Sequence, residues 1–219
     1  MNTNEEIIFK SNGWQAINRM GIINENYHTL ILNYRELMNE IVRIQLAPEP
    51  FLLLFHNENL NRYIFNFLAS TSALIDSCRS VMNFYKNTEI HEHYTKNIKE
   101  QFENNSIAVF IKDLRNYQMH YKTTFPYVTP DKQVCFETHE FKQYDRWTKL
   151  SKDFIKKQGE FIIIKPLFET YFKMLEPFYM NIYAELTKYH KQDFKETIEL
   201  AAKINMAIPN IYYKLLDQM

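Results

Sequence analysis

The residues best placed for chemistry in this sequence are Arg115, Asn116 and His120, which form the pattern R-N-x-x-x-H. Histidine has an unperturbed pKa of roughly 6.5, so it can donate or accept a proton near neutral pH. Arginine stays charged and presents a planar set of N–H donors that suits a phosphate group. An acid or base beside a charge stabiliser is the minimum needed to cleave a phosphodiester.

The segment that carries this pattern, residues 107–121, has the apolar spacing of an amphipathic helix. One stripe of that helix comprises Ile107, Phe110, Ile111, Leu114, Tyr117 and Tyr121. Asp113, Asn116 and His120 fall on the opposite side, and Arg115 falls on the flank. We therefore predict that these four polar side chains meet solvent, a ligand or a second chain, and that the core lies against the apolar stripe.

Arg115 and His120 are about 7.5 Å apart along the helix axis and point in different directions. A single phosphate could therefore touch both only through the long arginine side chain, or across a dimer in which each chain contributes one group. Asn116 and His120 are neighbours on the helix surface, one turn apart.

The segment from Phe110 to His120 resembles the signature helix of HEPN-domain proteins, a superfamily of helical bundles whose hallmark is R-x4–6-H. In that superfamily a polar residue commonly follows the arginine directly. Arg115, Asn116 and His120 match this pattern residue by residue. Residues 63–85 also look like the long core helix that precedes the signature helix in these proteins.

The resemblance implies a metal-independent endoribonuclease, because active members cut RNA where two copies of the motif meet at a two-fold interface. The 2′-hydroxyl attacks the adjacent phosphate and leaves a 2′,3′-cyclic phosphate. It also implies that Arg115 and His120 are the catalytic pair, and that Asn116 orients one of them or the scissile phosphate. RNA and a second copy of the chain are the expected partners, with no cofactor, metal or DNA. A toxin, phage-defence or stress-response role and a cognate inhibitor protein rest on the resemblance alone.

Other interpretations of the same helix stay open. The polar face could simply meet water, or it could belong to a non-catalytic interaction or dimerisation module, or the bundle could bind a nucleotide. Asp113, Asp76 and Arg79 are further candidates that could support the catalytic pair. For Asp76 and Arg79, one turn apart on a helix, an exposed ion pair worth about 0.2–0.5 kcal/mol is the favoured interpretation.

The rest of the chain predicts an all-α, up-and-down helical bundle in a single domain, residues 1–219. We expect a HEPN-like core at 20–124, an insertion and short helix at 125–160 and C-terminal helices at 161–219 that pack on the core. Apolar periodicity predicts helices at 22–46, 60–85, 89–102, 144–157 and 167–189, the first ending before Pro48 and Pro50. Prolines interrupt residues 125–142, where we expect a loop or hairpin with a strand near 133–141.

The charge of the chain argues against a protein that binds nucleic acid tightly without regard to sequence. Its 26 Lys and Arg residues balance 26 Asp and Glu residues, and its pI is near 7.1. A nuclease acting on one RNA would need only a local positive cleft. Cys78 and Cys135 are predicted to be free, buried thiols in a reducing cytoplasm. The first ten residues do not resemble a signal peptide, and no apolar run has the roughly 20 residues of a membrane span.

Overall fold

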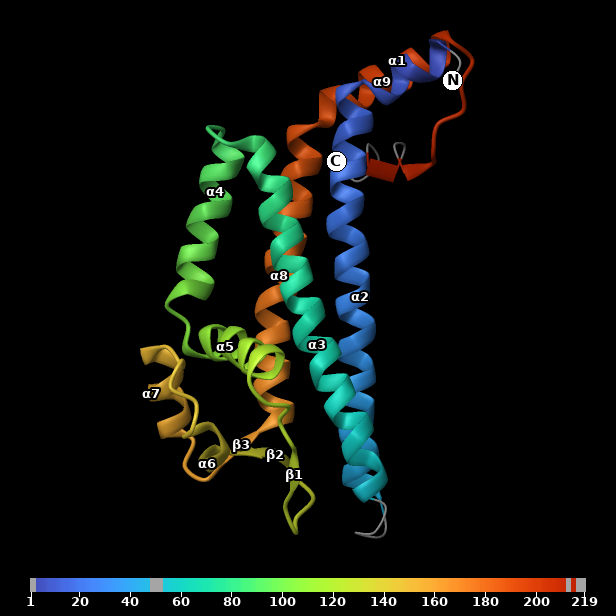
Figure 1. Cartoon of the computed structure of the whole chain (residues 1–219). Coiled ribbons are helices and arrows are strands. Elements are labelled where there is room, and N and C mark those ends of the chain that lie inside the picture. The colour runs from blue at the N-terminus through green and yellow to red at the C-terminus, as the bar shows by residue number, and fades with distance from the viewer. Residues whose placement is uncertain (1–2, 48–52, 212–213, 216–219) are drawn as a thin grey trace.

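The computed structural model describes residues 3–47, 53–211 and 214–215, and three long helices run along it. These are α2 (Asn12–Leu46), α3 (Leu53–Met82) and α8 (Ile164–Tyr189). Figure 1 shows α2 running antiparallel to both α3 and α8. The prediction of a mostly helical, all-α protein is confirmed. The predicted first helix begins ten residues earlier than expected, because the Ser11 side chain accepts a hydrogen bond from the Trp14 backbone N–H and caps α2. Pro48 and Pro50 lie outside the described residues.

Two short helices, α1 (Thr3–Phe9) and α9 (Lys191–Lys203), lie together at one end of the bundle (Figure 1). Helix α9 approaches α2 closely at Gly13. A Cβ atom at this position would stand 2.5 Å from the Thr197 hydroxyl oxygen and 2.6 Å from the Asp193 carbonyl oxygen. Glycine is therefore required at Gly13 for the two helices to pack as they do.

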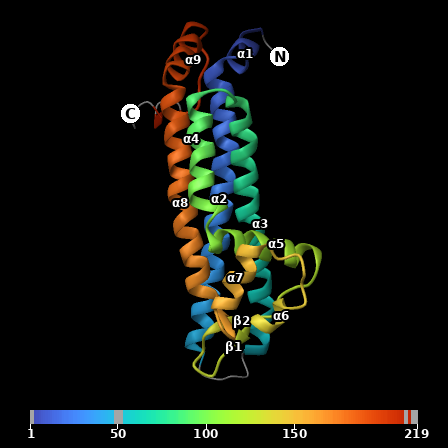
Figure 2. The same ribbon diagram turned by 90° about the vertical axis from the view of Figure 1, so that its left-hand side faces the viewer.

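A fourth helix, α4 (Glu89–Ile98), follows a 3-10 turn at Asn83–Tyr85 and packs against α8. It covers only part of the bundle's length, as the turned view in Figure 2 shows. After a π turn at Lys99–Glu103, helix α5 (Ser106–His120) runs across the bundle and packs on α3 and α8. The Asn105 side chain begins α5 by accepting hydrogen bonds from the Ile107 and Ala108 backbone N–H groups.

The chain between α5 and α8 forms a small layer beside the bundle. It contains β1 (Tyr127–Val128), β2 (Val134–Glu137), α6 (Thr138–Phe141), α7 (Lys149–Lys157) and β3 (Phe161–Ile163). The three strands make an antiparallel sheet in the order β1-β2-β3, with Cys135 opposite both Tyr127 and Ile163. The predicted strand near 133–141 ends at Glu137 and continues as α6, and β3 was not predicted as a strand.

The aromatic side chains, which are abundant in this sequence, mostly fill the contacts between helices. Tyr27 stacks on Tyr179 with ring centroids 3.8 Å apart, and Tyr34 stacks on Phe172 with centroids 4.0 Å apart. These pairs join α2 to α8. Stacked aromatic pairs add to the stabilisation that burial of their apolar surface provides.

Candidate functional site

Helix α5 carries the candidate residues, and its surroundings differ from those of a simple surface helix. Phe110, Ile111, Leu114 and Tyr117 are buried as predicted. The start of α7 packs against part of the opposite side and shields that part from solvent. The exposed residues of α5 are Lys112, Met119 and His120.

The prediction that Asp113 meets solvent or a ligand is wrong. Its side chain is buried, and its Oδ2 atom accepts three hydrogen bonds from the beginning of α7. The donors are the Thr148 backbone N–H at 2.9 Å, the Thr148 hydroxyl at 2.7 Å and the Ser151 hydroxyl at 2.7 Å. Asp113 therefore fastens the N-terminus of α7 to α5, where a negative charge also interacts well with the helix dipole.

Arg115 and Asn116 are half-buried and line one groove. The Arg115 Nη1 group donates a hydrogen bond of 3.2 Å to the Asn116 side-chain oxygen. The Arg115 Nε atom is buried and has no hydrogen-bond partner among the described residues. A buried N–H group is seldom left unpaired in folded proteins, so this donor is available to an anion or a water molecule.

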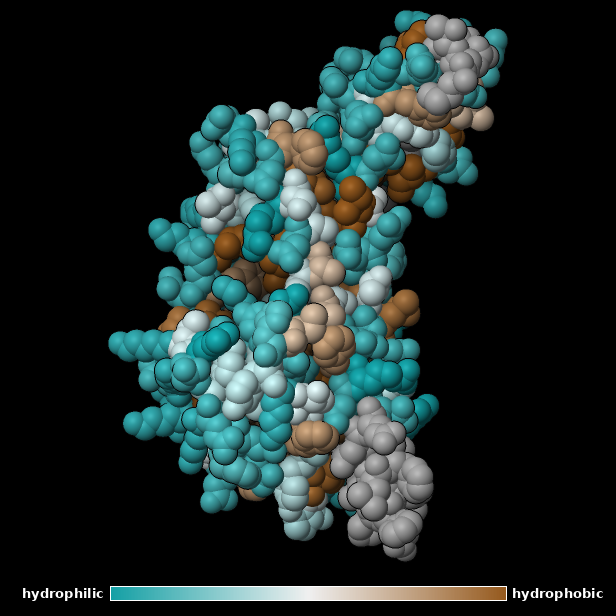
Figure 3. All heavy atoms as spheres, viewed as in Figure 1, coloured by the Kyte–Doolittle hydropathy of each residue, from teal (hydrophilic) through white to brown (hydrophobic). Residues whose placement is uncertain are grey.

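The groove that contains Arg115 has a volume of about 630 Å³ and lies where α3, α5, α8 and the start of α7 meet. Its lining is apolar at Ile75, Phe102, Ile111 and Phe178. It is cationic at Arg79, Lys112 and Lys149 and anionic at Asp76 and Glu103. Figure 3 shows hydrophobic surface recessed between hydrophilic side chains in the region between α3 and α4. Tyr171 also lines the groove, and burial raises the pKa of its hydroxyl.

Asp76 and Arg79 lie on α3 in the wall of the same groove as Arg115 and Asn116. Their side chains form the ion pair that the sequence predicted, with 2.8 Å between the Arg79 Nη1 and Asp76 Oδ1 atoms. Both side chains are 63% exposed, so solvent screens the pair and it contributes little to stability. Its position leaves Arg79 close enough to the groove to interact with a bound anion.

His120 is exposed, as predicted, but it does not line the groove. It is the last residue of α5, and Tyr121 beyond it is 52% exposed although the apolar stripe predicted it to be buried. The reason is that α5 ends at His120. Tyr121 is the C-cap residue, and its backbone angles lie outside the helical range (φ −130°, ψ −67°). Met119 and Phe125 are also exposed, so hydrophobic side chains flank His120 in sequence.

Sequence reasoning missed the groove-lining residues outside the motif, in particular Lys112, Lys149 and Tyr171. Lys112 lies three residues before Arg115 on α5, and this spacing could have marked a shared face. Lys149 and Tyr171 come from elements whose packing against α5 has no local sequence signal.

Comparison with known proteins gives no match to any family model, curated protein or solved structure. Among the described residues, no cluster of three or more His, Cys, Asp or Glu side chains could hold a metal ion. No helix in the part of the chain that the structure describes combines the length and hydropathy needed to cross a lipid bilayer.

Proposed function

We propose that this protein is a metal-independent endoribonuclease of HEPN type that cuts RNA as a homodimer. The observation that carries the proposal is the Arg115 side chain, whose buried Nε donor is unpaired and which lines a groove with further cationic residues. A phosphate in this groove would satisfy the unpaired donor. A guanidinium so placed would also stabilise the additional negative charge of a pentavalent transition state.

His120 supplies the acid–base chemistry in this proposal. Its imidazole would accept the proton of the 2′-hydroxyl or deliver a proton to the leaving 5′-oxygen. Because His120 of one chain does not line that chain's groove, the proposed site is completed by a second copy. The exposed hydrophobic side chains of Met119 and Tyr121, next to His120 in sequence, are suited to burial between the two copies.

RNA cleavage in EDTA, followed by analysis of the product ends, tests this function. We expect 2′,3′-cyclic phosphate ends from the wild-type protein. His120→Ala and Arg115→Ala should each lower the rate at least about a hundredfold, as expected for loss of a general acid–base or a charge stabiliser. The controls are His28→Ala and Arg35→Ala, which remove exposed side chains of the same types on α2. Equal rates in His120→Ala and His28→Ala would refute the assignment of His120.

A mixing experiment tests the composite site separately. In a symmetric dimer whose sites each combine Arg115 of one chain with His120 of the other, mixing the two inactive variants should restore about a quarter of the wild-type activity. No recovery under conditions where mixed dimers form would show that each chain acts alone.

The second candidate function is binding without catalysis, as an interaction or dimerisation module. It is favoured by one specific observation, the position of His120 outside the groove that contains Arg115. Intact RNA after incubation in EDTA with a large excess of the protein would favour this module over the nuclease.

A further inference from the structure

Basic residues concentrate in one segment of this otherwise neutral chain. Residues 142–157 contain six Lys and Arg residues and two Asp residues, whereas the whole chain has 26 of each sign. Four of the six lie on α7, at Lys149, Lys152, Lys156 and Lys157. Figure 3 shows hydrophilic side chains covering the part of the surface where α7 lies in Figure 1.

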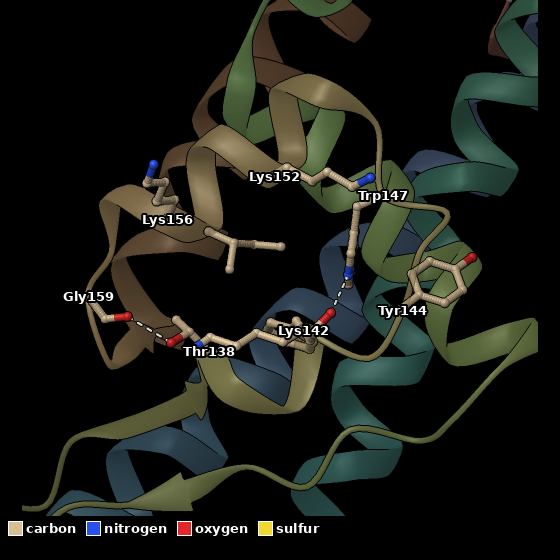
Figure 4. A pocket seen from close by; sticks show the side chains of 9 residues that line it. Thr138, Lys142, Tyr144, Trp147, Lys152, Lys156 and Gly159 are labelled. Carbon is tan, nitrogen blue, oxygen red and sulfur yellow. Dashed lines mark hydrogen bonds between the residues drawn. The ribbon is translucent and has the colours of Figure 1, made fainter.

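A hollow of about 370 Å³ lies beside α7, on the side where α6 and its following loop pack. Three lysines line it, Lys152 and Lys156 from α7 and Lys142 from the residue that follows α6. Figure 4 shows Lys142 and Lys152 on opposite sides of this hollow, with the Trp147 indole at one end. Apolar and aromatic side chains supply most of the remaining wall, namely Phe141, Tyr144, Trp147 and Ile155.

The aromatic wall of the hollow is held in place by contacts with the core. The Trp147 Nε1 group donates a hydrogen bond of 2.8 Å to the Phe141 carbonyl oxygen, drawn as a dashed line in Figure 4. The Trp147 ring also stacks on Tyr117 of α5, with centroids 5.4 Å apart. On the other side, the Thr138 hydroxyl donates a hydrogen bond of 2.7 Å to the Gly159 carbonyl oxygen. The wall is therefore formed before any ligand arrives.

The three ammonium groups have no carboxylate partner among the described residues. Lys152 donates a hydrogen bond of 3.2 Å to the Asp145 backbone oxygen, which leaves its charge uncompensated. Lysine ammonium groups bind phosphate as mobile point charges, and their long side chains can adjust to the position of the anion. Three such cations around a largely apolar hollow suit a ligand with a flat apolar part and a phosphate.

We propose that this hollow binds a nucleotide, with the base against the Trp147 and Ile155 side chains and the phosphate among Lys142, Lys152 and Lys156. The nucleotide could be free in solution or part of a single-stranded RNA, since the two share this chemistry. The site is separate from the groove at Arg115, since none of its lining residues is shared. It does not depend on RNA cleavage.

The two tryptophans of the chain offer a direct assay. In a Trp14→Phe variant, Trp147 is the remaining tryptophan and reports on the hollow by its fluorescence. We would titrate this variant with adenosine monophosphate, adenosine, inorganic phosphate and a short 2′-O-methyl oligonucleotide, which cannot be cleaved through its 2′-oxygen. Adenosine monophosphate or the oligonucleotide should bind at least about tenfold more tightly than phosphate or adenosine. Phosphate can contact only the lysines and adenosine only the apolar wall, whereas a nucleotide contacts both.

The lysines are tested by a matched pair of double variants in the Trp14→Phe protein. Lys152→Gln with Lys156→Gln should weaken nucleotide binding by about tenfold or more. Lys157→Gln with Lys188→Gln removes the same charge from exposed positions outside the hollow and should change binding by less than about twofold. Circular dichroism checks that all the variants are folded.

The oligonucleotide and the monophosphate identify the source of the ligand. Tighter binding of the oligonucleotide would assign the hollow to an RNA strand, and binding of the monophosphate alone would assign it to a free nucleotide. Two results would overturn the proposal: no fluorescence change with either ligand at millimolar concentration, or equal weakening in the two double variants.

Discussion

Asp113 connects α5 to α7, and its replacement tests how the candidate site is positioned. The residue is 6% exposed, and one carboxylate oxygen accepts all three hydrogen bonds from Thr148 and Ser151. A hydrogen bond to a charged group contributes about 1.5–3 kcal/mol, but bonds that share one acceptor are not additive. We expect Asp113→Ala to lower the free energy of unfolding by about 3 kcal/mol, since three donors lose their acceptor.

Asp113→Asn separates the charge from the geometry. The amide oxygen can take the place of Oδ2 and keep the same three donors, but the bonds are no longer assisted by a negative charge. Neutral hydrogen bonds are roughly half as strong, so this variant should lose about 1.5 kcal/mol. Asp153→Ala, at an exposed position on α7, is the control and should change stability by less than about 0.5 kcal/mol.

Urea denaturation followed by circular dichroism measures these changes, with the midpoints compared at equal slope. A loss below about 1 kcal/mol in Asp113→Ala would contradict the argument that buried, charge-assisted bonds hold α7 on α5. Equal losses in Asp113→Ala and Asp113→Asn would show that the three hydrogen bonds do not survive in the amide.

Three further predictions concern the helices and the thiols. Gly13→Ala should destabilise the fold by about 2 kcal/mol or more in urea denaturation, since its Cβ would collide with the Asp193 carbonyl. Gly21→Ala on the same helix meets no atom within 4 Å and should stabilise by about 0.5–1 kcal/mol, so a loss at both glycines would refute the steric explanation. Burial raises the pKa of Cys78 to about 12 and that of Cys135 to about 11, from an ordinary 9.0. A thiol reagent at pH 8 should therefore react about a hundredfold more slowly with the folded than with the urea-unfolded protein. The folded protein favours the neutral thiols, and the stability that this contributes is fully present below pH 9. It is lost as the pH rises toward 12 and the thiols ionise, and alkaline denaturation would measure the loss.

Apolar periodicity predicted the main helices because each of them buries one side along its length, and this places apolar residues at regular intervals in the sequence. Residues 22–46 and 167–189 lie within α2 and α8, and the helix predicted at 107–121 differs from α5 by one residue at each end. Strand β3 has no such signal. Phe161–Ile163 pairs with β2 across more than twenty residues, and a run of three apolar residues does not specify its partner.

The site residues show the limit of a helical wheel. The wheel assigns one apolar side to the core and treats the other side as surface, which was correct for His120. It was wrong for Asp113, because a helix between two layers has a second buried side. A polar residue on that side can be recognised only once its partners are known, and Thr148 and Ser151 lie 35 and 38 residues away in sequence.

The neutral net charge of the chain argues against an RNA substrate when only the sequence is considered. In the folded protein the same argument is weaker. Charges interact through water over a Debye length of about 8–10 Å, so acidic residues at the far end of the bundle scarcely affect the groove. Arg79, Lys112, Arg115 and Lys149 line that groove together with the two acidic residues Asp76 and Glu103. The hollow beside α7 adds three lysines in the small layer that also supplies Lys149 to the groove. The relevant charge for a phosphate is this local excess, and it predicts that binding of RNA weakens steeply as salt is raised.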